Sequence, residues 1–305
     1  MQVPTTVDRS RSAELQDVFV NHEGLIFRRG RIHPRSFAWE GNADHYRRPT
    51  RYAAFLCKTA LRRTVHVDEA AWIVDTWSGN YYHWVVESLT RLASLEDLPS
   101  TLLIPRYYRD YPYVAFTLRA FPEIRRIGWV GRKVNARVRT LLFPPRPAYG
   151  SSVAELHEVS RRIASLTGND DPRRLYITRE DALRRRLTNH REVEKMLHKY
   201  GFQALRIDPA RPEGQIRALK SADCVVAVHG AALTNLIFMP PGGDVIELRH
   251  SGNTNAYAPI ATAFGLRYHA LPCACSRGTA EEVNYADVTV DLHALEAMVA
   301  RAIKP

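Results

Sequence analysis

The stretch VVAVHGAALTNLIFMPPGGDVIEL, residues 225–248, constrains the fold more than any other part of the chain. Its first four residues form a continuous apolar run, which is typical of a strand covered on both faces in a parallel sheet. Residues 231–239 predict a short helix that two prolines end, and residues 245–248 predict a second buried strand. The stretch therefore predicts a β-α-β unit of minimal length, and with it a fold of the α/β class.

A candidate ligand site follows the first of these strands. His229 and Gly230 come directly after it, and glycine lets the chain turn and lets a ligand approach the backbone. A helix that starts at Ala231 directs its free N–H groups above the sheet, as in anion sites at helix N-termini. Ligands of open α/β sheets bind at the carboxyl ends of the strands, where Glu247 could accept from a ribose or sugar hydroxyl. Small residues occur at such turns in many α/β proteins, so this unit alone leaves the ligand open.

The positive charge of the chain gathers next to another predicted strand. The net charge of +11 favours anionic partners, which are nucleic acid, an anionic membrane surface or phosphorylated substrates. Residues 173–191 hold seven arginines against two acids, and Arg179 follows a strand at 175–177, at the sheet edge where His229 is expected. Guanidinium groups bind phosphate through hydrogen bonds of about 1.5–3 kcal/mol each. Two strand ends are predicted to converge on one diphosphate, the alternative being a solvated basic loop. The loop arginines are Arg184, Arg185 and Arg186.

A second candidate site lies in the first half of the chain. In GNYYHWVVESLTRL, His83 and Glu87 are four residues apart and project from one face of a predicted helix, with Asn80 as its N-terminal cap. Either side chain could act as a general base toward a hydroxyl group, or Glu87 could orient His83. The alternative is an ordinary His–Glu contact that stabilises the first turn of a helix.

The length of 305 residues favours two domains. Residues 18–51 alternate between apolar and polar around two glycines and predict a small antiparallel β-meander. From a strand at 71–75 onward, strand and helix patterns alternate as in a Rossmann-like domain, up to a proline-rich linker at 144–152. A second run of strands and helices follows. We expect domains at 1–150 and 151–305, with a last helix that could pack back on the first domain.

Several absences narrow the function. No apolar run reaches the ~20 residues of a membrane span, and the first residues lack the apolar core of a secretion signal, which predicts a cytoplasmic protein. Its charge would allow peripheral contact with an anionic inner membrane face. Four cysteines are too few and too unevenly spaced for a disulfide framework, and no D-x-D motif occurs, so neither a metal nor a cofactor is expected. No G-x-S-x-G elbow occurs, which argues against an α/β hydrolase.

Three segments resemble glycosyltransferase family 61. In order, they are NYYHWVVESLTRL, LYITREDALRRRLTNHREV and QIRALKSADCVVAVHGAALTNLIFMPPGGDVIEL, and they span residues 80–248. The resemblance implies a GT-B fold of two facing Rossmann-like domains, to which the small N-terminal β-meander is added. It also implies an inverting reaction, a nucleotide-sugar donor held by the second domain, and no obligatory metal. One position departs from the family, since His190 stands where an acid is usual, and this puts any role of such an acid in doubt.

The resemblance also implies roles for single residues. His83 or Glu87 would lie near the reacting hydroxyl group. By motif position the donor site would include Arg179, Arg185, His229, Gly230 and Asn235. With Asn189, which precedes His190, and the neighbours singled out above, the predicted donor-binding residues are Arg179, Arg185, Arg186, Asn189, His229, Gly230, Ala231, Asn235 and Glu247.

We therefore predict an inverting, metal-independent hexosyl- or pentosyltransferase. It would move a sugar from a nucleoside diphosphate donor, a UDP-sugar in the first place, to a hydroxyl group of a glycan or lipid-linked glycan. We expect the enzyme to be bacterial and to act in surface polysaccharide synthesis. The alternative is a non-catalytic basic module that binds RNA or an anionic polymer, although nucleic acid is not the partner we expect.

Overall fold

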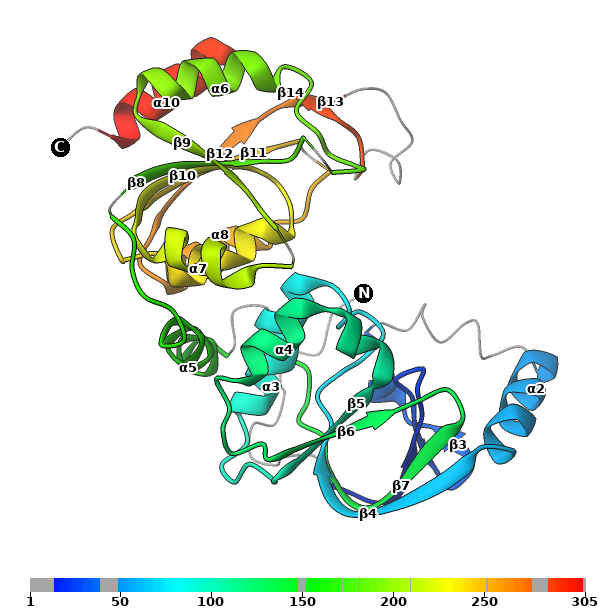
Figure 1. Ribbon diagram of the computed structural model, residues 1–305. Coiled ribbons are helices and arrows are strands. Elements are labelled where there is room, and N and C mark those ends of the chain that lie inside the picture. The colour runs from blue at the N-terminus through cyan, green and yellow to red at the C-terminus, as the bar shows by residue number, and fades with distance from the viewer. Residues whose placement is uncertain are drawn as a thin grey trace. The chain divides into compact units, whose positions relative to one another are not determined.

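The structure is a computed structural model that describes residues 14–38, 49–147, 152–171, 173–180, 182–208, 210–250, 252–275 and 285–303. They form a mixed α/β structure, as predicted, and contacts divide the chain into two compact units (Figure 1). The first unit comprises Met1–Ala148 and Ala154–Val159, and the second comprises Tyr149–Val153 and Ser160–Pro305. Of the predicted linker, residues 148–151 lie outside the described residues. No helix within the described residues is both long and apolar enough to cross a membrane.

The first unit is built on a seven-stranded sheet with the order β3-β2-β1-β7-β4-β5-β6. Strands β7, β4, β5 and β6 run parallel, and β1 pairs antiparallel with β7, so that Val18 lies opposite Val138. The predicted meander is present as β1, β2 and β3, although these strands span residues 14–32 and not 18–51, and it continues the parallel sheet as its antiparallel edge. The strands are β1 Glu14–Val20, β2 Ile26–Arg28, β3 Arg31–Ile32, β4 Arg63–Ala71, β5 Thr101–Pro105, β6 Arg126–Val130 and β7 Val134–Leu142.

Strand β4 lies earlier in the chain than predicted. The sequence predicts a strand at residues 71–75, whereas β4 ends at Ala71 and residues 72–75 follow it as irregular chain. Most residues of β4 are exposed or half-buried, so RTVHVDEAA carries little of the apolar pattern that marks a buried strand. The apolar run after it, at Trp72, Ile73 and Val74, is fully buried outside the strand. This run anchors the turn that leads into the helix of His83.

The helix that carries His83 begins where the sequence predicts. The Oδ1 atom of Asn80 accepts a hydrogen bond from the backbone N–H of Tyr82 at 2.9 Å, which confirms Asn80 as the cap. Residues His83–Ser88 form a π-helix, η3, which continues as α3 at Leu89–Ala93. Single π-helical turns inside helices are frequent at functional sites. The unit also contains η1 Pro34–Ser36, α2 Pro49–Ala60, η4 Arg106–Asp110 and α4 Pro112–Leu118, and α5 Val153–Ala164 is divided between the two units.

The second unit is an open sheet of five parallel strands with the order β12-β11-β10-β8-β9. The chain passes from β8 to the outer strand β9 and returns to β10 on the other side of β8. A topological switch point therefore lies between β8 and β10. Helices α6 and α10 cover one face of the sheet, and α7 and α8 cover the other (Figure 1).

The elements of the second unit have the following bounds. The strands are β8 Arg173–Thr178, β9 Phe202–Arg206, β10 Ala222–Val228, β11 Asp244–Arg249 and β12 Arg267–Pro272, with a separate pair β13 Ala274–Cys275 and β14 Val288–Thr289. The helices are α6 His190–Lys199, α7 Pro212–Lys220, η5 Ala231–Phe238, α8 Tyr257–Ala263 and α10 Leu292–Ala302.

The β-α-β unit predicted at residues 225–248 is present. Strand β10 has a parallel neighbour on each side, and residues 225–227 are at most 1% exposed, which explains their continuous apolar pattern. The 3₁₀ helix η5 and the buried strand β11 follow in the predicted order.

The closing helix α10 packs within the second unit. Its residues Leu295 and Val299 have no exposed surface and share a core cluster with Val193 and Leu197 of α6. The helix therefore contributes to the core of the second unit. The apolar face of α10 packs against the apolar face of α6. A sequence pattern shows that a helix has an apolar face but does not show which element that face packs against.

A buried ion pair ties the turn after β4 to helix α3. The Oδ2 atom of Asp75 lies 3.1 Å from Nη2 of Arg91, and the two side chains are 1% and 2% exposed. Arg91 also donates to the carbonyl oxygen of Ile73 at 3.0 Å, and Asp75 accepts from the backbone N–H of Trp77 at 2.9 Å. Burial lowers the pKa of Arg91, and the neighbouring Asp75 opposes this shift. Each charge thus depends on the other for its compensation.

Removal of the cation of this pair should destabilise the first unit. In Arg91→Leu, Asp75 keeps a buried charge with one partner fewer, and we expect the free energy of unfolding to fall by about 3–5 kcal/mol. The matched control is Arg139→Ala on β7, because the ion pair of Arg139 with Asp68 is exposed (71% and 88%) and should contribute little. Urea denaturation followed by circular dichroism measures both variants. Equal unfolding free energies for the two would contradict the prediction.

Candidate active site

The switch point of the second unit brings together residues from two strand ends. Arg179 follows β8, and His229 and Gly230 follow β10, which pairs with β8. The Cζ atom of Arg179 would lie only 3.1 Å from a Cβ atom built on Gly230. The backbone of Gly230 is extended, with φ of 162°, so the glycine is needed for space and not for its backbone angle. A guanidinium group therefore lies against the chain between the end of β10 and the start of η5.

The guanidinium group of Arg179 is held by the loop that follows β8. It donates to the carbonyl oxygens of Arg184 at 3.2 Å and of Arg185 at 3.3 Å. Burial lowers the pKa of Arg179, and the nearby charge of Arg185 adds to this shift. The backbone of Arg185 is left-handed, with φ of 56°, and its buried Nε atom has no hydrogen-bond acceptor among the described residues. Two neighbouring cations with an unused donor form a site that an anion would satisfy.

Two buried side chains hold His229. Its Nδ1 atom is hydrogen-bonded to Oε1 of Glu247, and the Oε2 atom of Glu247 accepts from the hydroxyl group of Tyr268. Burial and the hydrogen bond to Glu247 raise the pKa of Tyr268 to about 12, so this hydroxyl keeps its proton. The ring of Tyr257 packs edge-on against the imidazole, with the ring centroids 5.3 Å apart. The network orients His229 so that Nε2 is the nitrogen left for a ligand.

Glu247 is placed differently from the sequence expectation. It is the fourth residue of β11, which runs to Arg249, so it lies inside the sheet and not at the end of its strand. It has no exposed surface, and its two oxygens are engaged by His229 and Tyr268. Contact with a ribose or sugar hydroxyl is therefore not open to Glu247 in this arrangement, and its contribution is to orient His229. Ala231 is half-buried at the start of η5, directly after Gly230.

Three further predicted donor-site residues are engaged with the protein itself. Asn189 donates to the carbonyl oxygen of Val290 at 2.9 Å and accepts from its N–H group at 3.2 Å. Arg186 forms an ion pair of 2.9 Å with Asp287. Both residues thus fix the loop after β8 to the segment before α10. Asn235 is fully buried in η5, where it donates to a carbonyl oxygen of its own helix at 3.2 Å.

In the first unit, the π-helix brings His83 and Glu87 together. The Nδ1 atom of His83 lies 2.9 Å from Oε2 of Glu87, and the side chains are 18% and 7% exposed. Arg146, to which the sequence assigned no role, contacts the same carboxylate oxygen and lies 3.1 Å from Nδ1 of His83. Its Nη1 atom lies 3.5 Å from Asp75. Arg91, Asp75, Arg146 and Glu87 therefore form one row of alternating charges beside His83.

The contact with Arg146 bears on which ring nitrogen of a neutral His83 carries the proton. A guanidinium group only donates hydrogen bonds, so a bond from Arg146 to Nδ1 leaves the proton of a neutral His83 on Nε2. The contact of Nδ1 with Glu87 is close but is not a hydrogen bond, and Oε2 of Glu87 has no hydrogen-bond donor among the described residues. A turn of the imidazole that let Nδ1 donate to this oxygen would leave a lone pair on Nε2, which could then accept a proton from a hydroxyl group. The two tautomers thus give His83 opposite roles. Glu87 can also accept a proton itself, so both residues stay candidates for the base.

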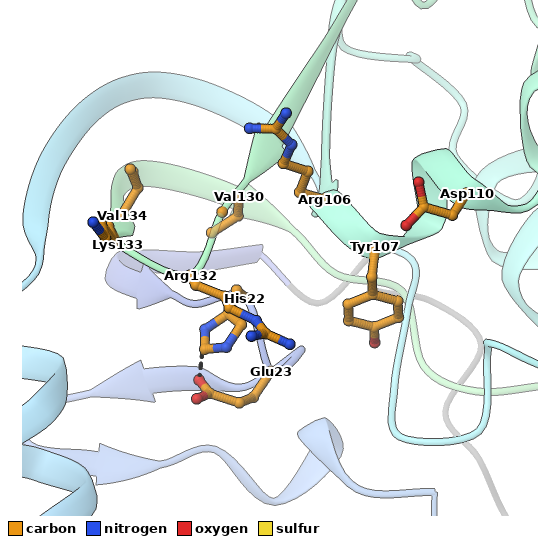
Figure 2. Close-up of a pocket in the computed structure, with 10 residues that line it drawn as sticks. His22, Glu23, Arg106, Tyr107, Asp110, Val130, Arg132, Lys133 and Val134 are labelled. Atoms are coloured by element: carbon orange, nitrogen blue, oxygen red, sulfur yellow. Dashed lines mark ion pairs between the residues drawn. The ribbon is translucent and has the colours of Figure 1, made fainter.

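Cavities also occur away from these residues. One of about 720 Å³ opens in the first unit between the β1–β2 turn, the start of η4 and the β6–β7 turn (Figure 2). The described residues that line it include none of the predicted site residues. His22 and Glu23 lie in contact at its edge, 3.2 Å apart, and burial lowers the pKa of His22. A cavity of about 280 Å³ in the second unit lies by Arg174, at the other end of β8 from Arg179.

These features define an α/β protein with a cationic switch point in one unit and a His–Glu pair suited to proton transfer in the other. Residues 81–246 match the family Glycosyltransferase 61. Because this match covers more than half of the chain, the protein belongs to that family. The resemblance of its three sequence segments to the family is thereby confirmed.

Curated relatives agree with this membership. The chain is 29% identical over 228 residues to a beta-1,2-xylosyltransferase of Oryza sativa subsp. japonica, which covers 67% of this chain and 36% of the relative. It is 30% identical over 70 residues to the EGF domain-specific O-linked N-acetylglucosamine transferase of Drosophila melanogaster, a match that covers 23% of this chain and 14% of the relative. It is 36% identical over 92 residues to a xylan glycosyltransferase of Arabidopsis thaliana, a match that covers 28% of this chain and 19% of the relative. The chain thus spans about a third of the rice relative.

A methyl group at position 230 should act through Arg179. In Gly230→Ala the guanidinium group must move away from the new Cβ atom, and we expect the affinity of the switch point for an anionic probe, inorganic pyrophosphate, to fall at least about tenfold, since a charge-assisted hydrogen bond is lost. The control is Gly168→Ala, where no heavy atom lies within 4 Å of the added Cβ atom. Titration calorimetry measures affinity, and thermal denaturation checks that both variants remain folded. Unchanged affinity in folded Gly230→Ala would contradict the prediction.

Proposed function

We propose that this protein is a glycosyltransferase that transfers a sugar from a nucleoside diphosphate donor to a hydroxyl group of a glycan acceptor. Membership of Glycosyltransferase 61 supports the reaction class, and the relatives are named as xylosyl- and N-acetylglucosamine transferases. The observation that carries the proposal is the close approach of Arg179 to Gly230 at the switch point. It gathers cationic donors where α/β sheets bind phosphorylated ligands.

The donor diphosphate would bind to Arg179 and Arg185, with the first N–H groups of η5 as further donors. Because Nδ1 of His229 donates to Glu247, its Nε2 atom can donate to the diphosphate only when the imidazole carries a second proton. The bond between the anomeric carbon and the diphosphate oxygen breaks with its electron pair on that oxygen, so negative charge develops there. Donors fixed in advance around this oxygen stabilise the charge in the transition state. Guanidinium groups and a helix N-terminus can supply that stabilisation, so metal independence is part of the proposal.

The acceptor hydroxyl group would lose its proton to Glu87 or His83. Its oxygen then attacks the anomeric carbon from the face opposite the diphosphate, and the configuration at that carbon inverts in one displacement. Inversion, a UDP-sugar donor and a GT-B arrangement of two facing domains are parts of this proposal. A bacterial source, a role in surface polysaccharide synthesis, a lipid-linked acceptor and a cytoplasmic location stay predictions.

The names of the relatives suggest the first substrates to test. Two of them are named as a xylosyltransferase and a xylan glycosyltransferase, so xylo-oligosaccharides are the first acceptors. UDP-xylose and UDP-N-acetylglucosamine are the first donors. A thermal-shift screen against nucleoside diphosphates and their sugars would identify the donor independently of the acceptor, since a ligand at one hundred times its Kd stabilises a fold by about 2.7 kcal/mol.

Loss of Arg179 should slow the chemical step. Arg179→Ala removes a donor to the leaving diphosphate, and we expect kcat to fall at least about a hundredfold. The matched control is Arg184→Ala, because the guanidinium group of Arg184 stacks on Tyr285, 4.4 Å from the ring centroid, and its loss should leave kcat close to wild type. Release of nucleoside diphosphate during transfer measures both variants. Near wild-type turnover in Arg179→Ala would refute this placement of the donor.

Two variants should separate the base from its helper. Glu87→Gln keeps the shape of the side chain but cannot take up a proton, and His83→Ala removes the imidazole. The variant that lacks the base should lose about a hundredfold or more in kcat, while the other loses less. Transfer rates measured across pH distinguish them, because only loss of the base removes the acidic limb of the profile. If neither variant slows transfer by about tenfold, general base catalysis by this helix is wrong.

A further inference from the structure

An exposed tryptophan lies beside the His–Glu pair. Trp77 belongs to the turn between β4 and the helix of His83, and 39% of its surface is exposed, which is unusual for so large an apolar side chain. Its ring centroid lies 5.1 Å from that of His83, with the two rings tilted by 48°. The sequence shows this residue only as part of a turn, because a single tryptophan carries no periodic pattern.

The indole of Trp77 is fixed in place. Its backbone N–H donates to the buried carboxylate of Asp75 at 2.9 Å, and the guanidinium carbon of Arg146 lies over the ring, 5.1 Å from its centroid. Asp75 is in turn held by Arg91 at 3.1 Å. Arg146 therefore contacts both Glu87 and the aromatic ring, while Asp75 holds the backbone of Trp77. A rigid aromatic surface loses little conformational entropy when a ligand covers it.

Such a surface suits one class of ligand. The C–H groups on one side of a sugar ring carry partial positive charge and pack against the electron-rich face of an aromatic ring. Hydroxyl groups at the rim of the same sugar stay free to hydrogen-bond with neighbouring polar groups. Next to Trp77 these groups are His83, Glu87 and Arg146, which include both candidates for the base.

We propose that Trp77 is the platform on which the sugar ring of the acceptor stacks, so that one of its hydroxyl groups faces His83 and Glu87. This inference rests on the proposed function, because it names the subsite that holds the acceptor in that reaction. It assigns to Trp77 the binding and orientation of the acceptor and no part in binding the donor. Loss of the aromatic face of Trp77 should therefore raise the KM of the acceptor.

The cavity of Figure 2 provides a control within the same unit. Tyr107 lines it and is 41% exposed, and its ring stacks on the buried ring of Tyr108 with centroids 4.7 Å apart. The two exposed aromatic residues thus differ in their neighbours, since the described residues that line this cavity include neither His83 nor Glu87. If this cavity held the acceptor ring, loss of Tyr107 and not of Trp77 would weaken acceptor binding.

The test compares Trp77→Phe, Trp77→Leu and Tyr107→Ala with wild type. Leucine keeps apolar volume but has no flat aromatic face. We expect Trp77→Leu to raise the KM of xylohexaose at least about tenfold, and Trp77→Phe to stay near wild type, because only the aromatic face contacts the sugar. In Tyr107→Ala, both the KM of xylohexaose and the hydrolysis of the donor without acceptor should match wild type. Thermal denaturation confirms that each variant is folded.

Direct binding of xylohexaose by calorimetry, without donor, separates this inference from the proposed function. Binding that Trp77→Leu loses and Trp77→Phe keeps supports the platform even if the wild type transfers no sugar. Three results overturn it: equal acceptor affinity in Trp77→Phe and Trp77→Leu, a KM effect in Tyr107→Ala instead, or no binding of xylohexaose to the wild type by either measurement. A fall in donor hydrolysis in Trp77→Leu at unchanged acceptor KM also overturns it, since Trp77 would then only support His83.

Discussion

The parallel pairing of β8 with β10 is the interaction on which the second unit and its candidate site depend. The chain leaves β8 for the outer strand β9 and returns on the other side, so the ends of β8 and β10 become neighbours although about fifty residues separate them. This pairing brings Arg179 and Gly230 together. The arginine side chain can lie there because position 230 has no Cβ atom. The loop after β8 holds the guanidinium group through two uncharged carbonyl oxygens.

The first unit contains two buried carboxylates that need positive partners. Asp75 and Glu87 are almost fully buried, and each requires a cation because an isolated buried carboxylate is costly. Arg91 compensates Asp75 from α3, and Arg146 reaches Asp75 and Glu87 from the segment after β7. The same guanidinium group approaches His83. Structural compensation of charge and the choice of tautomer at His83 are therefore coupled through one side chain, and Arg146 also lies over the ring of Trp77.

Predictions from the sequence succeeded where the pattern reports local burial or a local cap. The apolar run of β10, the short helix after it and the cap at Asn80 are of this kind. The strand predicted at 71–75 was wrong because β4 is largely exposed although it pairs with β7 along its length, so only the buried chain after it has an apolar pattern. Glu247 was expected at a strand end because the apolar run stops there, although the backbone ladder continues to Arg249.

The sequence by itself determined the family, the α/β class and the candidate residues His83, Glu87, Arg179, His229 and Gly230, because these lie in short segments whose spacing carries the signal. Only the tertiary structure decided which groups surround them. Arg146 stands in a proline-rich segment without a pattern, and Tyr268 lies on a strand that the sequence shows only as another apolar run. The reason is physical: compensation of a buried charge depends on distance in space, and a guanidinium group meets a carboxylate equally well from any point along the chain.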